Sequence, residues 1–190
     1  MVIKIRHKLI VLLTAMLVPV CMMMFLPSQP EVRWQADVFQ FITEKLKIRT
    51  GMSGPLAFYT VLVTAYFSIF SIIWAVILFG MIWQEDREST PQRKSQVAQF
   101  KLWDGVLVVV CIIGFIWFSF SMMQWHFAKQ DMTIGLGRNG YSFQLLYHYQ
   151  LGVVFAELFF MLFLVFSQLA ILMLVYASYH FIKEKFKRIE

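Results

Sequence analysis

The segment LGVVFAELFFMLFLVFSQLAILMLVYASYHFI, residues 151–182, decides the fold class of this chain. Its one acidic residue is Glu157, and it contains no lysine or arginine. An α-helix rises about 1.5 Å per residue, so roughly 20 apolar residues cross a bilayer core about 30 Å thick. The segment is longer than this requirement, and it therefore predicts a membrane-spanning helix.

Three other stretches have the same apolar character, and they cover residues 9–26, 56–83 and 102–125. Apolar residues make up 59% of the 190-residue chain and charged residues 15%. Soluble domains average about half apolar and about a quarter charged, so this excess needs lipid as its solvent. The sequence predicts an all-α integral membrane protein, with one membrane domain of four transmembrane helices.

The distribution of lysine and arginine predicts the orientation of these spans. Cytoplasmic segments of membrane proteins are enriched in both residues. With the N-terminus inside, the cytoplasmic segments, including the loop 84–101, hold 11 of the 17 cations and the opposite side holds 6. We therefore expect a bacterial inner-membrane protein with both termini in the cytoplasm and the loop 126–150 outside.

The link between the first two spans, residues 30–50, has the pattern of an amphipathic helix on the outer membrane surface. Apolar residues recur there at helical spacing, while charged residues occupy the other side. Gly51 follows as a helix stop. The helix is expected to pack against the membrane interface or to dock onto another protein, with Trp34, Phe41 and Leu46 as candidate partner contacts.

Glu157 is the leading candidate for a functional residue within a span. A carboxylate inside a membrane costs a few kcal/mol and usually faces a bundle interior or a polar cavity. Gly152 and Ala156 are four residues apart beside it, a spacing that lets another helix approach closely. Glu157 is thus either a proton- or ion-linked group, a polar lock to a partner helix, or an interfacial residue. All three residues are candidate partner contacts.

His126 and His148 flank the second outer loop and form a weaker candidate ligand set. A haem between helices needs two histidines at matched depth. Both histidines fall at the membrane edge, so surface positions are the favoured interpretation. The sequence predicts no catalytic residue, cofactor or metal, and no nucleic-acid partner or small-molecule substrate.

The expected function is that of a non-catalytic subunit or scaffold in a larger bacterial envelope complex, of the conjugation, secretion or respiratory type. Its partners would be the bilayer and other integral membrane proteins. One alternative is a small immunity or exclusion protein. The layout of the chain, with both ends inside, two short outer links and a basic tail at residues 183–188, resembles that of four-span colicin immunity proteins. The other alternative is a haem- or metal-bearing electron carrier using His126 and His148.

Overall fold

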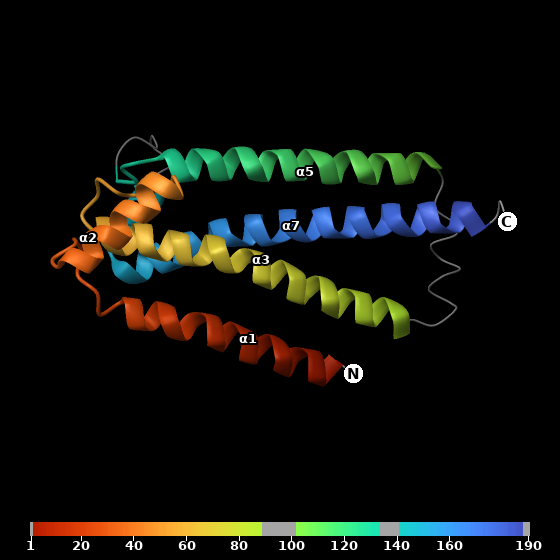
Figure 1. Ribbon diagram of the computed structural model, residues 1–190, viewed down its shortest axis with the longest axis horizontal. Helices are drawn as coiled ribbons and strands as arrows, with labels where there is room; N and C mark the ends of the chain where they lie inside the picture. Colours follow the sequence, from red (N-terminus) through yellow and green to blue (C-terminus); the bar gives the residue numbers. More distant parts are fainter. Residues whose placement is uncertain (1, 89–101, 134–140, 188–190) are drawn as a thin grey trace. The chain divides into compact units, whose positions relative to one another are not determined.

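A computed structural model describes residues 2–88, 102–133 and 141–187 of the chain (Figure 1). Within these ranges the structure is helical and has no strand, which confirms the predicted all-α class. The elements in chain order are α1 (Val2–Met23), α2 (Arg33–Gln40), the π-helical turn η1 (Phe41–Lys45), α3 (Ala57–Glu88), α5 (Leu102–Ala128), α6 (Tyr141–Leu146) and α7 (Gln150–Lys187).

Three helices are long and apolar enough to cross a membrane. Their qualifying segments are Ala57–Gln84 in α3, Val106–Ala128 in α5 and Gln150–Tyr179 in α7. They match three of the four predicted spans to within a few residues, so the chain has the character of a helical membrane protein. In α1, only Thr14–Met23 qualifies among the described residues, as a shorter apolar helix. The first span and the orientation therefore stay predictions.

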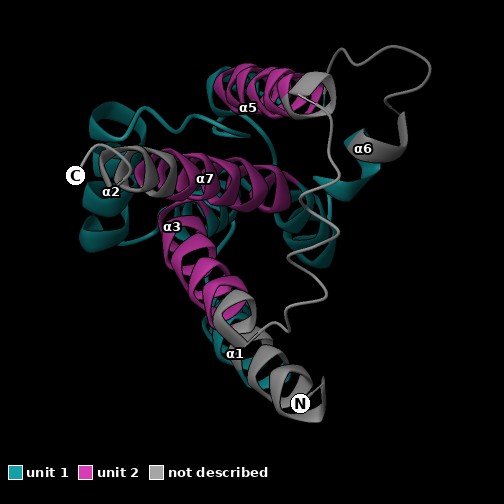
Figure 2. Ribbon diagram, turned by 90° about the vertical axis from the view of Figure 1, so that its right-hand side faces the viewer, with its two compact units in different colours: residues 1–67, 125–159 teal, residues 68–124, 160–190 magenta. Residues whose placement is uncertain are grey.

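The chain divides into two compact units, coloured in Figure 2. Unit 1 comprises residues 1–67 and 125–159, and unit 2 comprises residues 68–124 and 160–190. All three boundaries fall inside long helices, so α3, α5 and α7 each contribute residues to both units. The short elements α2, η1 and α6 belong entirely to unit 1.

The amphipathic segment is shorter in the structure than the predicted 30–50. The helix begins at Arg33, and its last turn, η1, is π-helical and ends at Lys45. Lys47 has a φ of 59°, a left-handed conformation that a right-handed helix does not contain. Gly51, expected to stop this helix, instead lies in a later turn with a φ of 66°. We call α2 and η1 together the outer helix, after its predicted position.

Unit 1 has an apolar core where the outer helix packs against the start of α3. Ile42 and Ile48 are buried there with Val61 and Ala65 of α3. The partly buried apolar residues packed against this core are Val38, Phe39, Met52, Leu62 and Phe127. The α1 helix joins the same unit through Tyr66 of α3, whose hydroxyl donates to the backbone oxygen of Met16 at 3.0 Å.

A ladder of backbone hydrogen bonds fastens the segment after the outer helix to the end of α5. The Arg49 N–H donates to the Phe127 oxygen at 2.8 Å, and the Gly51 N–H donates to the Lys129 oxygen at 3.0 Å. These bonds satisfy backbone groups that no helix pairs internally, which is a strict requirement near a membrane.

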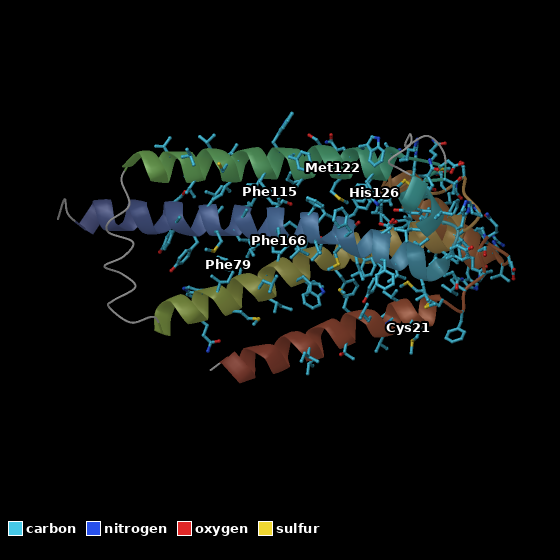
Figure 3. The ribbon with its side chains drawn as sticks, turned by 180° about the vertical axis from the view of Figure 1, so that it is seen from behind. Cys21, Phe79, Phe115, Met122, His126 and Phe166 are labelled. Carbon is cyan, nitrogen blue, oxygen red and sulfur yellow. The ribbon has the colours of Figure 1, made fainter. Side chains whose placement is uncertain are left out.

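Unit 2 is held mainly by side chains on long helices. The Phe115 ring on α5 stacks on Phe163 of α7 with centroids 6.5 Å apart. On α3, Phe79 meets Tyr176 edge-on at 5.9 Å. Figure 3 labels Phe115 and Phe79 on these helices. Much of α5 in this unit is exposed in the isolated chain, as expected of a helix whose outer surface contacts lipid.

Candidate functional site

A buried network of three ionisable side chains lies in unit 1, centred on Glu157. The Nε2 atom of His126 lies 2.9 Å from Oε2 of Glu157. The hydroxyl of Tyr147 donates to the other carboxylate oxygen, Oε1, at 3.0 Å. The exposed fractions are 0% for His126 and 2% for both Glu157 and Tyr147. We call these three residues the Glu157 network.

Three elements position this network. His126 belongs to the last turn of α5, where Figure 3 labels it, and Glu157 lies about two turns into α7. Tyr147 directly follows α6. A close turn between α6 and α7 places Tyr147 within hydrogen-bond distance of Glu157. The turn is so tight that a Cβ atom at Gly152 would collide with the backbone of Leu146. Gly152 thus permits a close approach, but within its own chain.

A third polar contact connects the network to the segment that follows the outer helix. The hydroxyl of Thr50 donates to the backbone oxygen of His126 at 2.8 Å, and Thr50 is fully buried. Thr50 belongs to the segment that pairs with the end of α5. The position of His126 is therefore fixed from its side chain by Glu157 and from its backbone by Thr50.

The electrostatics of the network favour a protonated tyrosine. Burial, followed by the nearby Glu157 carboxylate and its hydrogen bond, raises the pKa of Tyr147 above its ordinary value of 10.0. The phenol therefore stays a hydrogen-bond donor at physiological pH. With a partner on each carboxylate oxygen, Glu157 meets the condition under which a buried carboxylate is tolerated.

The chemistry of the network is that of a polar lock. Its three side chains are buried and contact one another. The contacts of His126 and Tyr147 with the two carboxyl oxygens of Glu157 join α5, the α6–α7 turn and α7 at one point. Among the described residues, no group of three or more His, Cys, Asp or Glu side chains is placed to hold a metal ion.

The two histidines of the predicted ligand set lie in different environments. His126, expected at the surface, is fully buried at the end of α5, where its Nε2 contacts Glu157 and its backbone oxygen accepts a hydrogen bond from Thr50. His148 is exposed next to Tyr147. The residue that accompanies His126 is therefore Glu157.

The six predicted partner contacts fall into two groups. We call the outer helix and the residues that follow it up to Thr50 the outer segment. Its Trp34, Phe41 and Leu46 are exposed, with exposed fractions of 54%, 57% and 40%. Gly152, Ala156 and Glu157 are buried within unit 1. The residues of the first group are exposed, whereas those of the second group are buried and Gly152 and Glu157 contact other segments of the same chain.

Sequence reasoning missed Tyr147 and Thr50 as members of this site. Tyr147 lies in a segment without clear periodicity, and Thr50 lies 76 residues before the backbone oxygen it contacts. One signal was present for Tyr147: a tyrosine ten residues before a membrane carboxylate offers a hydroxyl donor.

Comparisons with protein families, with curated proteins and with solved structures found no match for this chain.

Proposed function

We propose that this chain is a non-catalytic subunit of a larger assembly in the bacterial inner membrane, with both termini in the cytoplasm. In this proposal, an apolar stripe on the outer segment, formed by Trp34, Phe41 and Leu46, binds a second membrane protein. The supporting observation is that the same segment buries Ile42 in its own core and leaves these three large side chains exposed. Exposed clusters of large apolar residues are typical of interaction sites.

The charges beside the stripe favour a protein over lipid as its partner. Asp37 follows Trp34 by three residues, and Glu44 follows Phe41 by three. Residues three apart on an α-helix are neighbours on its surface, which places Asp37 beside Trp34 in α2, and both acids are exposed. Anionic lipid headgroups repel such carboxylates, whereas basic side chains of a protein complement them.

Trp34 is ordered before any partner binds. Its ring meets Phe58 edge-on, with centroids 6.4 Å apart and an interplanar angle of 76°. An aromatic side chain that is already held in place loses little conformational entropy on binding. Trp34 therefore has the properties of an interface anchor.

The Glu157 network supports the scaffold role by fixing the unit that carries the stripe. Thr50 links the network to the segment that follows the outer helix. Rigid support of a binding surface raises its affinity without new contacts. The network thus serves binding in this proposal and has no catalytic part.

The test is to purify the tagged chain in a gentle detergent and to quantify the copurifying membrane proteins by mass spectrometry. We expect Phe41→Ala and Trp34→Ala each to reduce recovery of a stoichiometric partner by about tenfold or more, since buried aromatic anchors contribute about 2 kcal/mol or more. Gln130→Ala is the control, because Gln130 is an exposed polar residue of unit 1 outside the stripe. Its recovery should equal that of the parent chain.

Unchanged partner recovery in both aromatic variants would contradict the proposal, provided that their melting temperatures match the parent. A chain that runs alone, in cells that become sensitive to one toxin or mobile element when it is removed, would replace the subunit function with an immunity or exclusion function.

A further inference from the structure

The outer helix ends at a second kind of surface, which is basic. Lys45 and Lys47 are exposed, and Arg49 and Lys129 are half-buried. The backbone ladder brings the two chain segments together, because the N–H groups of Arg49 and Gly51 donate to the oxygens of Phe127 and Lys129. We call Lys45, Lys47, Arg49 and Lys129 the basic rim.

The depth of the basic rim follows from the end of α5. The apolar segment that is able to span a membrane ends at Ala128, so Lys129 lies where the hydrocarbon region gives way to headgroups. Arg49 is at the same depth, since its backbone is bonded to Phe127. Lys47 is two residues away, a reach of about 7 Å at most. The rim therefore lies at the level of lipid phosphates.

The charge of the rim is not neutralised by nearby acids. Within the part of the chain that the structure describes, the one ion pair is His126–Glu157, and it involves no rim residue. Asp131, the acid closest to Lys129 in sequence, accepts hydrogen bonds from the backbone N–H and the hydroxyl of Thr133. The four rim cations thus form no ion pair among the described residues, although Glu44 directly precedes Lys45 in the chain.

We propose that the basic rim binds the phosphate groups of anionic phospholipids in the leaflet next to unit 1. Lysine ammonium groups and an arginine guanidinium are the side chains that recognise phosphate oxygens, and arginine does so through two parallel hydrogen bonds. The outer segment then has two partners with opposite charge preferences. Its acidic, aromatic stripe binds protein, and its basic rim binds lipid. The lipid site does not depend on the protein partner.

A simpler role for these cations is to stabilise the C-terminal ends of η1 and α5, where helix dipoles favour positive charge. That role predicts a loss of stability that is independent of the lipid present. The lipid site predicts a loss of binding that depends on headgroup charge. The two are therefore separated by varying the lipid.

The experiment titrates the full chain in neutral detergent with dioctanoyl phosphatidylglycerol, and counts bound lipid by native mass spectrometry. Dioctanoyl phosphatidylcholine and inorganic phosphate are run in parallel. The variant is Lys45→Gln with Lys47→Gln, which alters exposed side chains only. The control is Arg33→Gln, an exposed cation at the other end of the outer helix, about three turns away.

We expect phosphatidylglycerol to bind the parent chain more tightly than phosphatidylcholine, and inorganic phosphate to bind weakly. Each removed rim cation should weaken phosphatidylglycerol binding about fivefold at low salt, and less at high salt. The Arg33→Gln control should bind like the parent. Equal binding of both lipids, an equal loss in Arg33→Gln, unchanged binding in the double variant, or inorganic phosphate binding as tightly as the lipid would each overturn the proposal.

Discussion

Unit 1 and unit 2 draw on the same three long helices but are stabilised by different interactions. In unit 1, backbone groups and buried ionisable side chains connect segments that are far apart in the sequence, as in the bond from Thr50 to the His126 oxygen. In unit 2, ring contacts dominate, and Gln168 donates to the Ser71 hydroxyl at 3.1 Å. Unit 1 adds buried polar pairs to an apolar core, whereas ring contacts between helices are the main side-chain interactions of unit 2.

The difference reflects which backbone groups of each unit need a hydrogen-bond partner. A helix pairs its own backbone groups, so helices surrounded by lipid need only surface packing between them. Unit 1 contains non-helical backbone between its helices, and each buried N–H and C=O group there needs a partner. The Arg49 and Gly51 bonds to α5 meet that need. Polar pairing of this kind also fixes one arrangement, which a binding surface requires.

The largest expected effect comes from removing the centre of the Glu157 network. Glu157→Ala leaves His126 and Tyr147 buried without their shared acceptor, and should lower the free energy of unfolding by about 3–5 kcal/mol. Gln168→Ala in unit 2 removes a neutral hydrogen bond and should cost about 0.6 kcal/mol. Thermal unfolding of both variants in detergent measures the difference. Equal losses would mean that unit 1 does not depend more strongly on polar contacts.

A smaller effect is expected at the edge of the network, and it depends on pH. Tyr147→Phe removes a hydrogen bond to a carboxylate and should cost about 1.5–3 kcal/mol at neutral pH. Because the folded pKa of Tyr147 is raised, its contribution is complete below pH 10.0 and is lost as the pH rises toward the folded value.

The stability of the parent chain should therefore fall above pH 10, and that of Tyr147→Phe should fall less. Tyr149→Phe, at an exposed position, is the control and should follow the parent. Parallel pH curves for the parent and Tyr147→Phe would contradict the assignment.

The smallest effect compares one glycine from each unit. Gly51→Ala places a Cβ atom 2.7 Å from Cγ2 of Thr60 at a φ of 66°, and should cost about 1–3 kcal/mol. Gly114→Ala in unit 2 meets nothing within 4 Å and should leave stability unchanged or raise it by up to about 1 kcal/mol. Melting temperatures of the two variants decide the comparison. A loss at Gly114 as large as that at Gly51 would contradict it.

Several features of the site were predictable because they depend on local pattern. The length and apolarity of residues 151–182 predict a spanning helix wherever its neighbours lie, since burial in lipid needs no particular partner. The rarity of acids in such helices marks Glu157 as a residue with a special environment. The alternation of apolar and charged residues predicts the outer helix.

The partners of these residues were not predictable in the same way. His126 and Glu157 are 31 positions apart, and no periodicity states which turn of one helix lies beside which turn of another. The outer helix shows the same limit. Its apolar pattern includes both Ile42, which is buried, and Phe41, which is exposed. Both residues lie in the π-helical turn, whose residue spacing differs from the α-helical spacing on which the prediction was based.

The sequence by itself therefore determined that this chain forms apolar helices of membrane-spanning length, because the hydrophobic effect acts on each segment separately. It also determined that a carboxylate lies within one of them. Only the tertiary structure decided that Glu157 meets His126 and Tyr147, that Trp34 and Phe41 stay exposed, and that the backbone of Arg49 and Gly51 pairs with the end of α5. Each of these results depends on contacts between distant segments, which form only when the helices and their connecting segments pack together.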